Sequence, residues 1–130
     1  DGNQRTYHHT APINMMYALY QALIDIEKEG LKNVLRRHML VHDQLIKGLK
    51  KLNLEMLVQK NARLISLNAV KIPDGIDDLN IRSKLLYEYD IEIGGGLGPL
   101  AGKIWRIGLM GYSAREENVK RLLKALNHLL

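Results

Sequence analysis

The chain has 130 residues, of which 46% are hydrophobic, and this fits one compact domain with a moderate core. No apolar run reaches the roughly 20 residues that a membrane-spanning helix needs. The absence of cysteine excludes disulfides and thiolate metal sites, so we expect a cytoplasmic protein. The net charge of +5 permits an acidic partner, but few aromatic residues accompany lysines and arginines such as Arg37 and Lys47, which disfavours nucleic-acid binding.

The first residues predict an extended entry into a helix. Thr10 is a candidate N-cap, and Pro12 suits a first helical turn because the turn needs no N–H there. Apolar residues at helical spacing then predict a helix from residue 13 to Gly30, followed by a long amphipathic helix over residues 31–52. The chain opens abruptly and without methionine, so we expect a mature product or a piece of a longer chain.

Two strands and a third helix are predicted next. Residues 55–58 form a short strand candidate, and residues 63–72 form a longer one that a Pro-Asp-Gly turn closes. In the longer strand, alternation places Ile65, Leu67 and Ala69 on one face. Asp77 or Asp78 can cap a helix that continues to Tyr89.

A glycine-rich loop at residues 94–102 separates two further strands, at residues 91–93 and 103–109. Such glycine density indicates a backbone that approaches another group closely. Alternation in the second of these strands places Trp105 and Ile107 on a core face, and Arg106 on the opposite face.

The last helix follows a capping box from Ser113 to Glu116 and has an apolar stripe through residues 119–130. Few strands, with helices between and after them, predict an α+β fold in which a small, mostly antiparallel sheet carries helices on one face.

Arg106 is the leading ligand-binding candidate. A partly buried guanidinium among apolar neighbours requires an anion, and a carboxylate or phosphate can accept two parallel hydrogen bonds from it. An internal salt bridge, or a stem that extends over the sheet edge to water, would explain the same pattern.

Other motifs fail for physical reasons. The glycine loop is followed by a strand instead of a helix, which excludes a dinucleotide-binding loop, and Ile104 after Lys103 lacks the hydroxyl of a phosphate-binding P-loop. Adjacent His8 and His9 should point in opposite directions on an extended segment, so we predict no metal site. No set of residues has a spacing specific to catalysis.

Three separated motifs carry a family resemblance, and they follow one another in order along the chain. They are Tyr7-His8-His9-Thr10-Ala11-Pro12, then Asp90-Ile91-Glu92-Ile93 with Gly95-Gly96-Leu97-Gly98, and Trp105-Arg106-Ile107-Gly108-Leu109-Met110-Gly111. Together they resemble the carboxy-terminal part of the alanine–glyoxylate (serine–pyruvate) aminotransferases, which are class V, fold type I enzymes dependent on pyridoxal phosphate.

The resemblance implies a role for this part of the enzyme. Arg106 matches the arginine that holds the substrate's α-carboxylate, and Tyr7 and Thr10 match residues that reach the cofactor phosphate of the neighbouring subunit in a homodimer. It implies that residues 1–12 connect to a preceding large domain and that residues 13–130 form the small carboxy-terminal domain. The lysine that binds the cofactor would lie in the large domain, because Lys103 occupies no position that the family uses.

The expected activity is amino transfer between a small amino acid, alanine or serine, and a 2-oxo acid such as glyoxylate or pyruvate. This chain alone should be inert and supply the carboxylate clamp and dimer contacts. A free-standing α+β module that binds a small acid or regulates another protein is the alternative.

Overall fold

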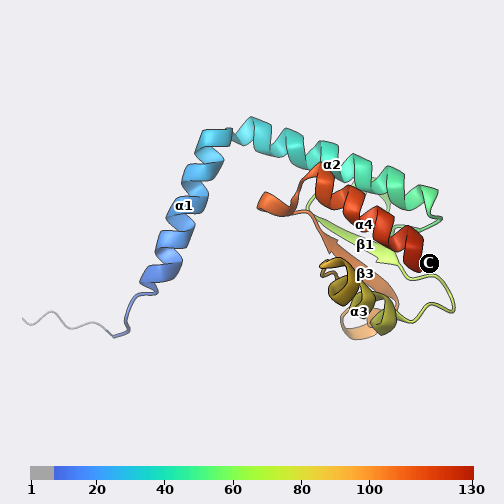
Figure 1. The fold of residues 1–130 in the computed structure, drawn as a ribbon. Coiled ribbons are helices and arrows are strands. Elements are labelled where there is room, and N and C mark those ends of the chain that lie inside the picture. The colour runs from blue at the N-terminus through green and yellow to red at the C-terminus, as the bar shows by residue number, and fades with distance from the viewer. Residues whose placement is uncertain (1–7) are drawn as a thin grey trace, which may run out of the picture. The chain divides into compact units, whose positions relative to one another are not determined.

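The computed structural model describes residues 8–130, which divide into two compact units. One unit ends at Val34 and the other runs from Leu35 to Leu130. The elements follow the order α1, α2, β1, α3, β2, β3, α4 (Figure 1), so the predicted α+β class is confirmed. The expected division at residues 12 and 13 between a connecting segment and a domain stays a prediction.

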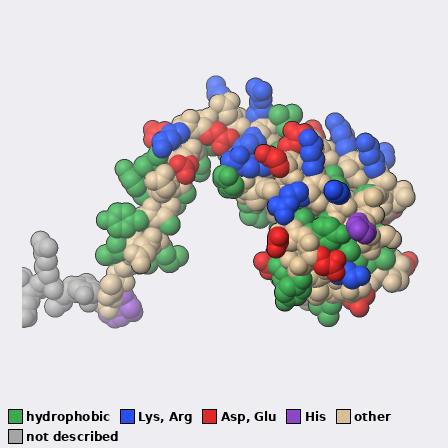
Figure 2. Space-filling model, in the orientation of Figure 1, with side chains coloured by type: hydrophobic (Ala, Val, Ile, Leu, Met, Phe, Trp, Pro, Cys, Tyr) green, Lys and Arg blue, Asp and Glu red, His purple; other side chains and the backbone are tan. Residues whose placement is uncertain are grey.

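The first unit is dominated by α1, Ile13–Glu29. Gly30 ends the helix with φ +81°, a conformation that glycine adopts without strain, and its N–H donates to the Ile26 carbonyl oxygen. None of the helix residues is buried, and large apolar side chains are exposed along its length (Figure 2). These side chains are Ile13, Met15, Met16, Tyr17, Leu19, Tyr20, Leu23 and Ile26.

The second unit contains a three-stranded antiparallel sheet in the order β1, β3, β2. These strands span Leu67–Lys71, Ile104–Gly108 and Gly94–Gly95 respectively. The register pairs Val70 with Trp105, and Trp105 with Gly95 on its other side.

One face of the sheet is buried against helices. Trp105 and Ile107 are among the most buried side chains, as alternation in the sequence predicted, and they share one hydrophobic core with residues of α2, α3 and α4. These helices span Leu31–Lys51, Asp78–Tyr89 and Glu116–Leu129. Gly48 of α2 lies against Leu123 of α4, so the two helices approach closely where the glycine has no side chain (Figure 1).

Several strand predictions are wrong. Residues 55–58 contribute only an isolated bridge between Met56 and Val70, and β1 is shorter than the predicted strand. The buried face of β1 carries Asn68 and Val70, whereas Leu67 is exposed. Apolar residues occur on both faces of this segment, and the pairing with β3 decides which face is buried.

Two predicted caps are also wrong. Pro12 occupies the N-cap position of α1 without a side-chain hydrogen bond, so Thr10 does not cap this helix. Ser113 instead closes a short 3₁₀ turn, accepting from the N–H of Met110 and donating to its carbonyl oxygen. Arg115 is the N-cap of α4, where no side chain bonds the free N–H groups. The predicted cap at Asp77 is confirmed, since its carboxylate accepts from the N–H of Asn80.

The basic residues divide into solvated and structural ones. Lysines and arginines lie exposed over α2 (Figure 2), but Arg37 is partly buried. Its Nη1 donates to the carbonyl oxygens of Gly111 and Ala114, and this ties α2 to the segment that precedes α4. Within residues 8–130, no helix is long and apolar enough to cross a membrane.

Candidate functional site

Arg106 lies on the sheet face opposite the core, in the middle of β3. Its neighbours across the two ladders are Ala69 of β1 and Gly94 of β2. Both neighbours are small, so the guanidinium can lie across the glycine strand. A Cβ built on Gly94 would lie only 3.2 Å from Nη2 of Arg106.

A backbone hydrogen bond fixes the orientation of this arginine. Its Nε donates to the Gly95 carbonyl oxygen at 2.7 Å, and the side chain is half-buried. Among residues 8–130, Nη1 and Nη2 of Arg106 have no hydrogen-bond acceptor and no carboxylate within salt-bridge distance. The internal salt bridge considered from the sequence is therefore absent from this part of the chain. Two donor groups at the outer edge of a fixed guanidinium match the geometry of a carboxylate.

A second charged group occupies the helix side of β2. Arg82 and Asp78 of α3 form a two-point ion pair, with Nε to Oδ1 at 2.8 Å and Nη2 to Oδ2 at 3.1 Å. Asp78 Oδ1 also accepts from Nε1 of Trp105 at 3.0 Å. The hydrogen bond to Asp78 raises the pKa of Arg82 above its usual value.

This ion pair was missed from the sequence, although its spacing was a signal. An aspartate four residues before an arginine on a helix is a favourable arrangement for a side-chain pair. The indole of Trp105 could not be assigned to it, because no sequence pattern indicates a contact between residues 27 positions apart.

The glycine loop packs against itself. Residues 98–100 form a 3₁₀ turn, and a Cβ on Gly96 would lie 1.8 Å from the carbonyl oxygen of Leu100. The same Cβ would lie 3.0 Å from the Ile104 side chain. The loop therefore requires glycine at residue 96 for its own closure, beside the strand that carries Arg106.

Of the two predicted cofactor ligands, the structure describes only Thr10. Thr10 is exposed and its hydroxyl makes no capping hydrogen bond, so it is available to an anion. Tyr7 lies outside the described residues. The neighbouring histidines do not point apart as predicted, because the Nδ1 atoms of His8 and His9 lie 2.7 Å from each other. Within residues 8–130, no three His, Asp or Glu side chains gather as metal ligands would.

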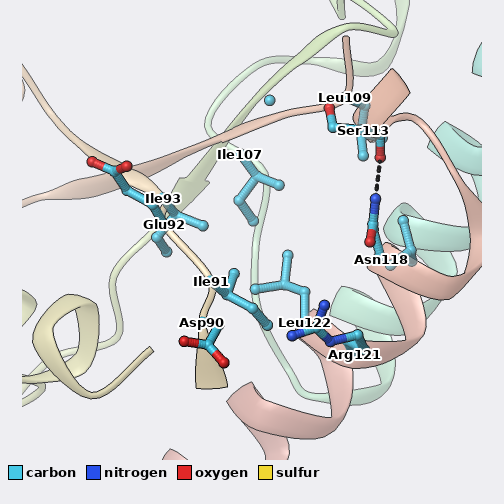
Figure 3. A pocket seen from close by; sticks show the side chains of 12 residues that line it. Asp90, Ile91, Glu92, Ile93, Ile107, Leu109, Ser113, Asn118, Arg121 and Leu122 are labelled. Carbon is cyan, nitrogen blue, oxygen red and sulfur yellow. Dashed lines mark hydrogen bonds between the residues drawn. The ribbon is translucent and has the colours of Figure 1, made fainter. Parts of the chain in front are cut away.

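A cavity of about 200 Å³ lies elsewhere in the second unit, between α4 and the segment that leads into β2 (Figure 3). Ile91, Ile107 and Leu122 provide apolar lining. Two of its polar side chains are already engaged, since Asn118 donates to the Ser113 carbonyl oxygen and Arg121 to the Tyr89 carbonyl oxygen. Neither Arg106 nor Thr10 lines this cavity, so the face around Arg106 remains the candidate site.

No family model matches the chain. Over 131 residues the chain is 42% identical to the alanine–glyoxylate aminotransferase of Felis catus, and the match covers all of this chain and 32% of that protein. Over 127 residues it is 40% identical to the (S)-ureidoglycine–glyoxylate transaminase of Bacillus subtilis, covering 98% of this chain and 30% of that protein. The crystal structure of an alanine–glyoxylate aminotransferase from Nostoc sp. superposes with a TM-score of 0.90 and 48% identity, over 98% of this chain and 34% of that one.

The chain is homologous to the carboxy-terminal part of these aminotransferases. The resemblance inferred from three motifs is thereby confirmed, as is the fold that it implied. The chain spans about a third of the length of the curated aminotransferases that it matches.

Proposed function

We propose that this chain is the carboxy-terminal part of a pyridoxal-phosphate-dependent aminotransferase. The enzyme would transfer an amino group between a small amino acid, alanine or serine, and a 2-oxo acid such as glyoxylate or pyruvate. The names of the relatives support glyoxylate as the acceptor, since it occurs in the names of both the alanine and the ureidoglycine enzymes. In this proposal, residues 1–12 connect to a preceding large domain and residues 13–130 form the small domain.

Arg106 is the residue through which this chain would hold the substrate. The observation that carries this assignment is a guanidinium that a backbone carbonyl holds by Nε while both terminal nitrogens lack partners within residues 8–130. A substrate carboxylate would accept from these nitrogens side by side, and the charge on each partner strengthens both bonds. The amino acid would then be oriented by its carboxylate before it reacts, which is a positioning role.

Among the described residues, Thr10 would make a small contribution to cofactor binding. Thr10 offers an exposed hydroxyl without a capping bond, and such a hydroxyl can donate to a phosphate. Thr10 and Tyr7 would hold the phosphate of pyridoxal phosphate across the interface of a homodimer. When bound, this cofactor supplies the electron sink for bond changes at the amino acid's α-carbon. The lysine that carries it and most phosphate contacts would belong to the remaining two thirds of the enzyme.

The homodimer is part of the same proposal. Exposed apolar side chains along α1 form more apolar surface than a monomer normally leaves in water, which supports a contact with a second subunit. Light scattering on the full-length protein should give twice the mass of one chain, and a monomer that retains full activity would contradict this part of the proposal.

Activity of the full-length enzyme is the test of the function. Purified protein that contains pyridoxal phosphate is expected to convert alanine and glyoxylate into pyruvate and glycine, with serine and pyruvate assayed as the alternative donor and acceptor. No turnover with any pairing of these amino acids and 2-oxo acids would overturn the proposal.

A further inference from the structure

The strand β2 consists of two glycines that lie between two guanidinium groups. On the open face, Gly94 lies beneath the guanidinium of Arg106, and on the helix face a Cβ at Gly95 would lie 3.3 Å from Cζ of Arg82. The ladder explains the two sides, because Gly94 pairs with Arg106 and Gly95 pairs with Trp105. Because β2 has no side chains, its two residues are held by backbone bonds of the ladder and lie against these two guanidinium groups.

The two guanidinium groups differ in how their charge is balanced. Arg82 is neutralised by two hydrogen bonds to Asp78, whose side chain is only 13% exposed. Asp78 is also held by the fully buried indole of Trp105. Arg106 has no such partner within residues 8–130 and depends on the Gly95 carbonyl for its orientation.

We propose that Asp78, with Arg82 and Trp105, is a positioning group that holds β2 in place so that the Gly95 carbonyl can orient Arg106. The chain of contacts is short: Asp78 fixes Arg82 and the indole, these two flank Gly95, and the Gly95 oxygen fixes Nε of Arg106. A displaced carbonyl would rotate the guanidinium and misalign both of its free nitrogens with a carboxylate. This inference rests on the proposed function, because it assigns Arg106 an amino-acid substrate.

Asp78 is not the capping group of α3. A helix start needs a capping group, and Asp77 already provides it through the Asn80 N–H. Asp78 points instead to Arg82 and Trp105, and in this way it links α3 to both β2 and β3.

The experiment compares Asp78→Asn with Asp77→Asn in the full-length holoenzyme. Both variants lose one carboxylate at adjacent positions of the same helix start, but only Asp78 contacts the residues that flank β2. We expect Asp78→Asn to lower kcat/KM for the amino acid about tenfold, mainly through KM, with cofactor affinity unchanged. Asp77→Asn should stay within about twofold of the parent enzyme in the same assay.

A double-mutant cycle tests whether the effect passes through Arg106. In an Arg106→Ala background, Asp78→Asn should cause almost no further loss, since the group that it positions is gone. Losses that multiply would overturn the inference, because Asp78 would then act by another route. Arg82→Lys should keep part of the kcat/KM that Arg82→Gln loses. If the Asp78 variant does not fold, these two Arg82 variants, each also made in the Arg106→Ala background, test the inference in its place.

Hydrogen exchange separates this inference from the proposed function. In the full-length enzyme without substrate, Asp78→Asn should accelerate amide exchange in residues 91–97, whereas Asp77→Asn should not. Unchanged exchange in this segment would overturn the inference even if activity falls. If Arg106→Ala alone leaves kcat/KM near normal, the proposed clamp fails, and exchange alone then decides whether Asp78 holds β2.

Discussion

Replacing Arg106 with alanine in the full-length enzyme should remove the carboxylate clamp and little else. The side chain contacts Gly95 and Gly94, and it lies on the face away from the buried core. Its loss therefore leaves no cavity among the core residues around Trp105. The variant should fold and retain its cofactor.

The magnitude follows from the two terminal nitrogens of Arg106, which have no partner within residues 8–130. Hydrogen bonds to a charged group contribute about 1.5–3 kcal/mol, and the guanidinium is already oriented by the Gly95 carbonyl, so little side-chain entropy is lost when substrate binds. Since a tenfold change corresponds to about 1.4 kcal/mol, kcat/KM for the amino acid should fall about ten- to a hundredfold. Arg106→Lys should recover only part of this, because an ammonium lacks both the planar fork and the Nε donor.

The assay is steady-state transamination of alanine with glyoxylate, with Arg63→Ala as the matched control. Arg63 is also half-buried and donates its Nε to a backbone carbonyl, that of Val58, at 2.8 Å, but it lies outside β3 and has no proposed role in binding. The control should keep kcat/KM within about twofold. A near-normal kcat/KM in Arg106→Ala, or an equal loss in both variants, would refute the clamp.

Three further predictions concern the loop, the cofactor contacts and this chain alone. Gly96→Ala should lower the melting temperature sharply, because its Cβ would overlap the Leu100 carbonyl oxygen. The control Gly108→Ala, whose Cβ would be 3.7 Å from its nearest neighbour, should change the melting temperature little. Equal melting temperatures of the two variants would show that the loop does not close as described. Replacing Tyr7 with Phe and Thr10 with Ala together should weaken retention of pyridoxal phosphate, measured by equilibrium dialysis, more than it alters the preference between alanine and serine; unchanged retention would remove both residues from the cofactor site. The 130-residue chain alone, mixed with pyridoxal phosphate, should show neither a site-specific absorbance change nor transamination, and turnover by it would disprove the assignment of the catalytic lysine to another domain.

The sequence predicted β3 well because one face of this strand is consistently apolar. Trp105 and Ile107 alternate with Arg106, and the buried face matches that pattern. In β1 the sequence was ambiguous, since apolar residues occur on both faces of the predicted strand. Asn68 is buried because it pairs with Ile107 of β3. Only the pairing of two strands distant in sequence could decide this.

The candidate site was predictable in its central residue but not in its supports. A lone arginine among apolar and glycine neighbours indicated Arg106, but a backbone acceptor such as the Gly95 carbonyl leaves no mark in a sequence. The Asp78–Arg82 pair had a recognisable spacing, whereas its link to Trp105 depends on how α3 packs on β3. At Ser113 two local hydrogen-bonding arrangements were possible, and its hydroxyl closes a 3₁₀ turn at Met110 instead of capping α4.

The most direct test of the proposed clamp is whether Arg106 recognises a carboxylate. The full-length enzyme and its Arg106→Ala variant would each be assayed with alanine and with alaninamide, which lacks the carboxylate charge but keeps the amino group. If Arg106 binds the carboxylate, the parent should prefer alanine by about ten- to a hundredfold in kcat/KM, and this preference should collapse to near unity in the variant. A preference for alanine that survives the loss of Arg106 unchanged would contradict it.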